Sequence, residues 1–330
     1  MTLRLGFAGN GYIARIHATA AHAAGARIAS VANHRAESRA AFAERFGVER
    51  QFDSVPEMLA GGGIDGLVVC TPNASHAPET IAALAAGIPV LVEKPMAMNA
   101  DEAAAMHRAS VGASVPLMVA HCWRFDAEAR WLRAQVLEGK LGRIVRTKGY
   151  GVHVNWGPKG WFTQKAFAGG GALADMGIHA LDTVRYLLGD PAPSRIYASV
   201  GTHYREMDVD DTGVIVVTWA DGTTSSIESG WFQPQADGPE AATQLYGTLG
   251  YGRIFPTELR PVEGEPVDPG FVFPRQPHCL PEMYETQMRA FLDAIASGVV
   301  VDGTAAESVV NARIMDAMYE SARTGEVVHL

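Results

Sequence analysis

The chain has 330 residues, and 48% of them are hydrophobic, which is enough apolar material for two separate cores. At roughly 150 residues per domain, this length predicts two domains. The formal net charge of −9 arises from intermingled acids and bases without a basic stripe, which argues against nucleic acid as a partner.

The chain shows no feature of a membrane-bound or secreted protein. Its N-terminus lacks the apolar core of a signal peptide, and no apolar run approaches the ~20 residues that span a bilayer. Cys70, Cys122 and Cys279 are widely spaced and odd in number, a pattern that favours neither a disulfide framework nor a zinc cage. We expect a cytoplasmic protein that contacts no membrane, binds no metal and acts on a small molecule.

Residues 1–121 alternate short apolar runs with alanine-rich helical patterns. Continuous apolar strands separated by helices are typical of a parallel sheet that is covered on both faces. We therefore predict an α/β fold that begins with a doubly wound parallel sheet. The expected strands are residues 3–8, 27–32, 66–70, 88–92 and 116–121.

A glycine-rich fingerprint follows the first predicted strand and opens a helical pattern at residues 9–14. It matches G-x-G-x-x-G/A, in which glycines let the backbone approach a pyrophosphate that the helix N-terminus stabilises. A glycine turn without a ligand is the alternative, but the strand before it and the βαβ rhythm after it favour a dinucleotide. The predicted contacts are Gly9, Asn10, Gly11, Tyr12 and Ile13.

The end of the second predicted strand bears on the choice of cofactor. NAD-binding chains place an acid there, ~20 residues after the glycines, to bind the ribose 2′-hydroxyl. Asn33 stands in that place and would not repel a 2′-phosphate, while His34, Arg35 and Arg39 offer donors and positive charge. We predict NADP in preference to NAD, although the two arginines could instead be solvated charges on a helix face.

Two further segments follow predicted strands at the edge where such sheets bind ligands. Cys70-Thr71-Pro72-Asn73, with His76 three residues on, suits either cofactor contact or turn and cap chemistry. Glu93-Lys94-Pro95 delivers a charged side chain from a strand end, unless Lys94 only anchors its loop by pairing with Glu93. The predicted cofactor contacts of these segments are Cys70, Thr71, Pro72, Asn73, His76, Glu93 and Lys94.

The pattern changes after residue 121 to longer strands, one pair of which is joined by the hairpin signal Asp221-Gly222. This predicts a second domain of α+β type over residues 122–330 with a mainly antiparallel sheet, and a long loop over residues 261–281. The expected strands are residues 143–152, 194–204, 213–220, 223–231 and 241–246.

Residues 169–182 form the densest motif of the second domain. In a helix that follows the three glycines, Asp175 and His179 are an i, i+4 pair, and Asp182 lies three residues further on. A histidine held by a carboxylate is suited to proton transfer near neutral pH. The alternative is a hydrogen-bonded helix histidine without chemistry, but three successive glycines suggest a close backbone approach.

These motifs together resemble the Gfo/Idh/MocA family of oxidoreductases. The resemblance implies an N-terminal Rossmann domain and a C-terminal open antiparallel sheet through which homodimers or homotetramers pack. It also implies NAD(P)-dependent hydride transfer with a secondary alcohol or ketone of a sugar, cyclitol or polyol. The matching residues are Gly9, Gly11 and Ala14, then Thr71-Pro72-Asn73, His76, Glu93-Lys94-Pro95, Trp123-Arg124-Phe125, the motif over 169–182, and Ser321-Ala322-Arg323-Thr324-Gly325.

The resemblance also implies roles for single residues. His179 matches the residue that takes the proton from the substrate hydroxyl, Lys94 would stabilise charge on that oxygen, and Asp175 would orient the histidine or bind a neighbouring hydroxyl. Arg124 and Trp161 occupy motif-like positions, so the predicted substrate contacts are Lys94, Arg124, Trp161, Asp175 and His179. His153, Asn155 and Trp156 could also contact the substrate, but a role in a surface loop or in the core is at least as well supported for them.

Two other functions are compatible with the same chain. One is a catalytically silent NAD(P)-binding regulator, although the joint presence of Lys94, Asp175 and His179 argues against it. The other is an enzyme like aromatic dihydrodiol dehydrogenase or biliverdin reductase, for which Trp156, Trp161 and Trp231 would line a less polar pocket.

Overall fold

The computed structural model describes residues 2–236, 238–271 and 280–330. The chain divides into two compact units, Met1–Cys122 with Pro281–Val309, and Trp123–Leu280 with Val310–Leu330. The first break lies within one residue of the predicted boundary after residue 121. The predicted second domain, residues 122–330, differs from the second unit because Pro281–Val309 groups with the first.

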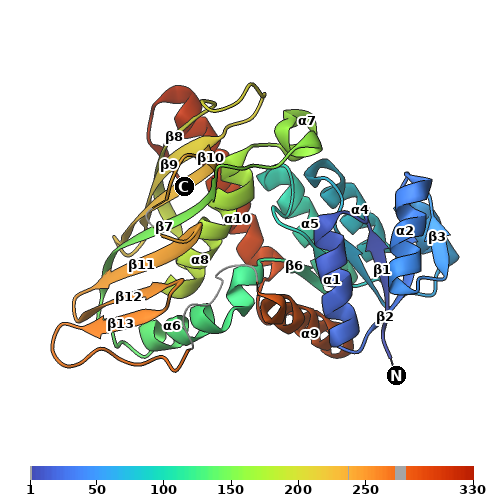
Figure 1. Cartoon of the computed structure of the whole chain (residues 1–330), viewed down its shortest axis with the longest axis horizontal. Coiled ribbons are helices and arrows are strands. Elements are labelled where there is room, and N and C mark those ends of the chain that lie inside the picture. The colour runs from blue at the N-terminus through green and yellow to red at the C-terminus, as the bar shows by residue number, and fades with distance from the viewer. Residues whose placement is uncertain (1, 237, 272–279) are drawn as a thin grey trace. The chain divides into compact units, whose positions relative to one another are not determined.

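The first unit is built on a six-stranded parallel sheet in the order β3-β2-β1-β4-β5-β6 (Figure 1). This confirms the predicted doubly wound sheet, and every predicted strand agrees to within two residues. The unpredicted strand, β3, is three residues long and lies at the edge. The strands are β1 (Arg4–Ala8), β2 (Arg27–Ala32), β3 (Arg50–Phe52), β4 (Gly66–Val69), β5 (Val90–Val92) and β6 (Leu117–Val119).

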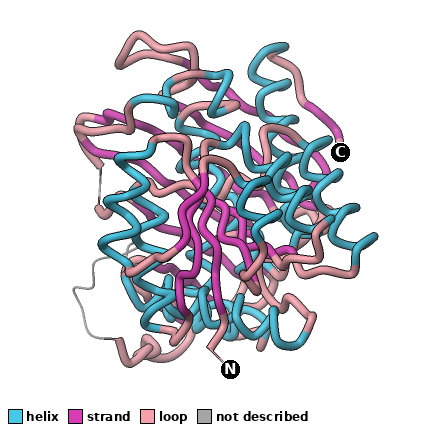
Figure 2. Tube along the Cα trace, turned by 90° about the vertical axis from the view of Figure 1, so that its right-hand side faces the viewer, coloured by secondary structure: helices cyan, strands magenta, loops and turns pink. Residues whose placement is uncertain are grey.

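Helices cover both faces of this sheet, and Figure 2 shows its strands in magenta between helices in cyan. On one face α1 packs against α9, and on the other α4 packs against α3 and α5. The helices are α1 (Tyr12–Ala23), α2 (Ala36–Phe46), α3 (Val55–Gly61), α4 (Asn73–Ala85), α5 (Ala100–Ala113) and α9 (Pro281–Ser297).

Tight packing explains why α9 groups with the first unit although it lies near the end of the chain. A Cβ added to Gly66 in β4 would lie 2.7 Å from Ile295 and 3.2 Å from Phe291, so the helix rests directly on the strand. The buried ring of His17 in α1 also meets Tyr284 edge-on, at 5.7 Å between centroids. Gly66 in β4 is therefore the position at which α9 approaches the sheet, a contact that the hydrophobic periodicity of the sequence does not indicate.

The second unit contains an eight-stranded mixed sheet in the order β13-β12-β11-β7-β10-β9-β8-β14. All neighbours are antiparallel except β7 and β10, so the sheet is mainly antiparallel as predicted. The Asp221-Gly222 hairpin is confirmed between β9 and β10. The strands are β7 (Ile144–Val154), β8 (Pro193–Gly201), β9 (Thr212–Trp219), β10 (Thr224–Gln233), β11 (Ala241–Gly247), β12 (Gly250–Ile254), β13 (Glu258–Pro261) and β14 (Val328–His329).

One face of this sheet carries the core. α8 packs on β7, β10 and β11 (Figure 1). Leu181 and Val184 of that helix join Ile215 and Ile227 of the sheet in one buried cluster. Along β9, buried side chains that face this core alternate with more exposed side chains on the other face of the sheet. The helices are α6 (Ala127–Leu137), α7 (Lys165–Ala168), α8 (Ile178–Leu188) and α10 (Ala305–Thr324), which starts in the first unit and continues into the second from Val310.

The predicted loop over residues 261–281 is only partly described, since residues 272–279 and with them Cys279 lie outside the described part. In its described part, up to residue 271, Val267 forms one isolated bridge with Leu259 of β13.

Candidate functional site

One group of predicted site residues lies in the first unit where β1, β4 and β5 end, at neighbouring positions in the parallel sheet. Gly9 follows β1 with φ +85°, a left-handed conformation that favours glycine, and a Cβ there would lie 2.6 Å from the carbonyl oxygen of Cys70. The Gly9 amide donates to Ala32 at 2.9 Å and the Cys70 amide to Ala8 at 2.8 Å. Gly9 thus allows the chain after β1 to pass close to the ends of β2 and β4.

Gly11 begins α1 and differs from Gly9 in what surrounds it. No atom lies within 4 Å of a Cβ built on Gly11, and no side chain caps the first turn of the helix. Tyr12 and Ile13 follow it in that first turn, and Tyr12 is well exposed. Amide groups at an uncapped helix N-terminus beside open space fit an anionic pyrophosphate.

Asn33, predicted to contact the ribose of the cofactor, forms hydrogen bonds through both polar atoms of its side-chain amide. Its Nδ2 donates to Asn10 Oδ1 at 3.0 Å, and its Oδ1 accepts from the Arg35 amide at 2.8 Å. Arg39 donates to the Asn33 carbonyl and pairs with Asp53. The positive charge of Arg39 is therefore partly balanced by a carboxylate that sequence reasoning did not consider, whereas His34 and Arg35 are exposed.

Glu93 ties the loop after β5 to the helix of the glycine fingerprint. Its Oε1 lies 2.7 Å from Nε2 of the fully buried His17 in α1, and its Oε2 accepts from the Lys94 amide at 3.0 Å. Burial alone would raise the pKa of Glu93. The hydrogen bond and charge of His17, the charge of Lys94 and the bond from the Lys94 amide outweigh burial, so the pKa is lowered and the carboxylate stays ionised. Glu93 thus holds the backbone from which half-buried Lys94 projects.

His76 fastens the same region from α4. Its Nδ1 lies 2.9 Å from the carbonyl oxygen of Pro95 and its Nε2 lies 2.9 Å from that of Thr71. The ring is buried, and burial lowers the pKa of His76 although both carbonyl contacts oppose that shift. This geometry supports the capping alternative for His76, because the ring joins two loops. Asn73, the first residue of α4, is buried as well.

A second acid at this end, Glu79 in α4, was missed by sequence reasoning. It accepts a hydrogen bond from Thr71 Oγ1 at 2.7 Å. Burial raises the pKa of Glu79 to about 7, and the bond from Thr71 offsets only part of the shift. Its position two turns into a helix of mostly small residues gave no motif by which to find it.

A second group of predicted site residues lies in the second unit, on the helix that follows the three glycines. Residues Leu173–Gly177 form a π-helical turn that leads into α8, a departure from the predicted regular helix that is frequent at functional sites. Within residues 171–187 only Asp175 and His179 are half-buried, while the others are buried. These two side chains are thus the ones that this segment presents at its surface.

Aromatic side chains fix both groups. Trp231 in β10 is 0% exposed, and its Nε1 donates to Asp175 Oδ2 at 3.0 Å. The His179 ring stacks on buried Trp123, at 4.7 Å between centroids and an interplanar angle of 22°. Trp231 was one of the residues considered for a less polar pocket, but its burial and its bond to Asp175 give it a supporting role instead.

Two of the three glycines, Gly170 and Gly171, lie close to protein atoms. A Cβ on Gly171 would lie 2.7 Å from both the carbonyl carbon and the amide nitrogen of Asp210, and one on Gly170 would lie 2.6 Å from the Tyr319 ring. Asp210 accepts from the Gly171 amide at 2.9 Å, the Leu173 amide at 2.8 Å and the Tyr319 hydroxyl at 2.8 Å. The close approach predicted from the glycines is thus made by an acid that caps the π-helical turn.

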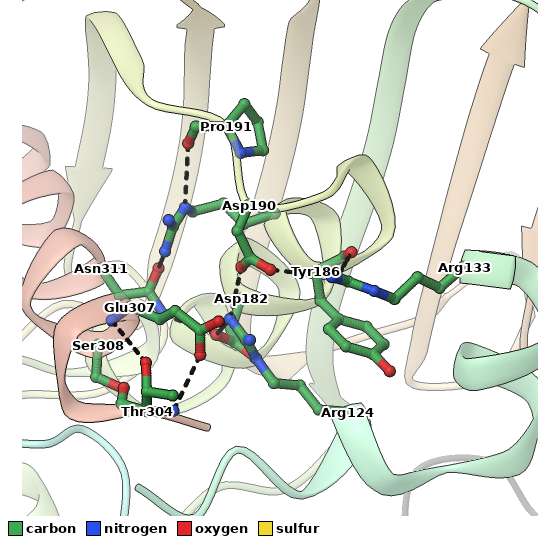
Figure 3. A network of polar contacts seen from close by, with 11 residues as sticks. Arg124, Arg133, Asp182, Tyr186, Asp190, Pro191, Thr304, Glu307, Ser308 and Asn311 are labelled. Carbon is green, nitrogen blue, oxygen red and sulfur yellow. Dashed lines mark hydrogen bonds and ion pairs between the residues drawn. The ribbon is translucent and has the colours of Figure 1, made fainter. Parts of the chain in front are cut away.

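The structure places Arg124 away from its predicted role in substrate binding. Its side chain is 0% exposed and forms a bidentate pair with Asp182, both bonds being 2.8 Å long, and a third bond of 2.9 Å to Asp190 (Figure 3). Asp182 also accepts from Asn311 at 2.7 Å. Asp182, which the helical pattern placed beside His179, therefore belongs to a buried network in which an unpaired charge would be costly.

Trp161, the other predicted substrate residue outside the Asp175 helix, is half-buried and stacks on Phe162 at 3.8 Å between centroids. Lys94 belongs to the first unit, whereas Asp175 and His179 belong to the second. In the described residues, no group of three His, Cys, Asp or Glu side chains is placed to hold a metal ion.

Comparison with known proteins agrees with this division. Residues 3–121 match the model of an oxidoreductase family with an NAD-binding Rossmann fold, and residues 129–252 match the GFO/IDH/MocA C-terminal domain. D-xylose 1-dehydrogenase (NADP(+)) 2 from Haloferax volcanii is 31% identical over 90% of this chain and 90% of its own length. The chain belongs to the Gfo/Idh/MocA family. It is therefore an oxidoreductase whose first unit is an NAD-binding Rossmann domain.

Other members of the Gfo/Idh/MocA family resemble it along its whole length. 1,5-anhydro-D-fructose reductase from Ensifer adhaerens is 29% identical over 99% of this chain and 98% of its own. The solved structure of levoglucosan dehydrogenase in complex with NADH superimposes with a TM-score of 0.89, at 25% identity, and covers 100% of this chain and 99% of that one. In the present chain, none of the helices in the described residues is long and apolar enough to cross a membrane.

Proposed function

We propose that the protein transfers a hydride between a nicotinamide dinucleotide and a secondary alcohol or ketone of a sugar, cyclitol or related polyol. The observation that carries this proposal is the selective exposure of Asp175 and His179 on an otherwise buried segment. Their positions match the proton-transfer motif of the family, and Lys94 matches its lysine. The names of the relatives, which act on anhydrofructose, xylose and levoglucosan, support the same substrate class.

The residues divide the chemistry between them. His179 takes the proton from the substrate hydroxyl during oxidation and returns it during reduction, with its ring plane fixed by Trp123. Lys94 stabilises negative charge on the reacting oxygen, and Asp175, oriented by Trp231, binds a neighbouring hydroxyl or steers the histidine. A nicotinamide bound at the glycine end supplies the acceptor or donor of the hydride.

The fit of the cofactor end supports dinucleotide binding, since Gly11 leaves open space beside an uncapped helix N-terminus. The finer proposal is NADP in preference to NAD, because Asn33 leaves no carboxylate at the end of β2 and Arg35 is exposed nearby. Asp53, which pairs with Arg39, moderates this preference. Arg124 is left out of the proposed substrate contacts because its buried network occupies it.

Assembly through the second unit is also proposed. Tyr197, Val214 and Val216 lie on β8 and β9, and they are 45%, 52% and 36% exposed. They are neighbours in register, since Tyr197 pairs with Val216. Apolar side chains on a sheet face suit a homodimer or homotetramer contact.

The test is turnover of sugars and polyols, followed by the absorbance of the reduced nicotinamide. Lys94→Ala and His179→Ala should each lower kcat by about 10²–10⁴-fold, because each removes a group that acts on the transferring proton or the developing charge. Cofactor affinity, measured by fluorescence titration, should stay within about threefold of the wild type.

The matched control is Lys165→Ala, which removes an exposed lysine that begins α7 and should leave turnover unchanged. Near wild-type kcat in both site variants would contradict the proposed roles. Absence of cofactor reduction by the wild type with every sugar would contradict the function itself.

A further inference from the structure

A second carboxylate, Glu240, organises a cluster beside Asp175 within the second unit. Glu240 directly precedes β11, and its carbonyl accepts from the Val152 amide of β7 at 2.8 Å. The pairing of β7 with β11 thus fixes the backbone of this residue. No sequence motif marks Glu240, because its neighbours in the cluster lie about 85 residues away in the chain.

Three donors meet the Glu240 carboxylate. The Val154 amide and Trp156 Nε1 donate to its Oε1, each at 2.8 Å, and His153 Nδ1 lies 3.4 Å from its Oε2. Burial raises the pKa of Glu240, but the bonds from Val154 and Trp156 and the contact with His153 outweigh it, so the pKa is lowered. An ionised acid therefore holds an indole and an imidazole in place.

The two rings form a rigid stack. His153 and Trp156 lie 3.6 Å apart between centroids at an interplanar angle of 27°. His153 is buried, whereas Trp156 is 50% exposed, so the imidazole packs against the indole and leaves a large part of it open to a ligand. On its other edge, His153 Nε2 lies 3.8 Å from Asp175 Oδ2, which places the stack next to the proposed proton-transfer helix.

The chemistry of this stack favours a cyclic sugar. An exposed indole face with negative charge density attracts the weakly positive C–H bonds that a pyranose or cyclitol ring presents on one side. The hydroxyls around that ring are polar, and Asp175 and His153 lie beside the indole to receive them. An acyclic polyol has no flat apolar face to set against the indole, and its ordering on binding costs more conformational entropy.

We infer that Trp156 is the platform on which a cyclic sugar ring stacks, and that Glu240 is the positioning residue that holds the platform through Trp156 and His153. This inference rests on the proposed function, whose substrate class it narrows from polyols in general to ring forms.

The experiment compares Trp156→Leu, Trp156→Phe and Glu240→Gln with the wild type on two cyclic probes, methyl β-D-glucopyranoside and myo-inositol, and two acyclic probes, sorbitol and xylitol. Trp156→Leu should raise KM for the cyclic probe that is turned over by about tenfold, with kcat within about threefold. Trp156→Phe, which keeps a ring but loses the bond to Glu240, should raise KM by about threefold. Glu240→Gln should raise KM less than Trp156→Phe does, because its amide oxygen can still accept from Val154 and Trp156, and only the contact with His153 is lost.

Trp131→Leu is the matched control, because it removes another half-buried tryptophan, which lies in α6 and contacts Phe271 edge-on. It should leave the KM of every probe unchanged. Circular dichroism of each variant reports whether the fold is kept. Unchanged KM for cyclic probes in folded Trp156→Leu, or turnover of the acyclic probes alone, would overturn the inference while the proposed function stands.

Sugar-dependent thermal stabilisation separates the two proposals. A wild-type protein that is stabilised by the cyclic probes but reduces no cofactor, with the stabilisation lost in Trp156→Leu, would remove the proposed function and keep the platform. A wild-type protein that shows neither stabilisation nor turnover would overturn both.

Discussion

The two units position their functional groups by different means. At the glycine fingerprint of the first unit the backbone does so, since the ends of neighbouring strands lie at one sheet edge and Gly11 leaves open space at a helix N-terminus. In the second, side chains do so, since Asp210 caps the turn at Gly171 and Trp231 holds Asp175. Gly11 and Gly171 therefore differ in what surrounds them: the first lies beside open space, and the second is in close contact with protein atoms.

The largest effect that tests this contrast is expected for Gly171→Ala. The new Cβ would lie 2.7 Å from backbone atoms of Asp210, which cannot rotate away as a flexible side chain could. Relief of the clash must move Asp210 and break its bonds to the Gly171 and Leu173 amides. We expect the free energy of unfolding to fall by about 3–5 kcal/mol, measured by urea denaturation, with loss of turnover.

Gly11→Ala is the counterpart in the first unit. Its φ is −70° and no atom lies within 4 Å of the added Cβ, so the free energy of unfolding should change by less than about 1 kcal/mol. The cofactor KM should rise at least about tenfold, since the methyl group enters space proposed for the pyrophosphate. Equal losses of stability in both variants would contradict the distinction between the two glycines.

The same contrast explains how far the sequence could predict this molecule. Apolar strands, the glycine fingerprint and the hairpin at Asp221-Gly222 are local patterns, and they predicted both sheets. Contacts such as that of Glu240 with His153 join residues far apart in the chain and have no local pattern. Arg124 shows the converse, since its motif-like position predicted substrate contact, whereas buried carboxylates from α8 and the turn after it surround it.

The next effect concerns the two carboxyls that sequence reasoning missed, Glu79 and Glu240. Several donors lower the pKa of Glu240, whereas burial beside a single hydroxyl raises that of Glu79 to about 7. A raised folded-state pKa means that the native state binds more protons than the unfolded chain between pH 4.5 and about 7. The free energy of unfolding should therefore fall as the pH rises through this window.

Glu79→Gln should remove this pH-dependent loss. The amide oxygen can still accept from Thr71, but no buried charge forms at high pH. At pH 8 the variant should exceed the wild type by up to about 2 kcal/mol, with little difference at pH 4. Thermal denaturation across this range measures the effect, with Glu44→Gln on the exposed face of α2 as the control. If stability changes with pH in the same way in the wild type and in Glu79→Gln, the ionisation of Glu79 does not contribute to the pH dependence.

The smallest effect concerns the end of β2, where we propose that Asn33 decides whether the cofactor site accepts a 2′-phosphate. In Asn33→Asp the new carboxylate keeps its bond from the Arg35 amide, and Asn10 can turn its buried, unbonded Nδ2 toward it. The fold should therefore tolerate the change, while the added negative charge repels a 2′-phosphate and can bind a ribose hydroxyl.

We expect the ratio of kcat/KM for NADP to that for NAD to fall by about tenfold in Asn33→Asp, the effect of one surface charge at close range. Asp53→Asn should move the ratio the other way, because it removes the counter-charge of Arg39. Opposite shifts would show that charge at the end of β2 sets the preference. An unchanged ratio in both variants would mean that the ribose end of the cofactor is recognised elsewhere, and that the first unit relies on its backbone alone.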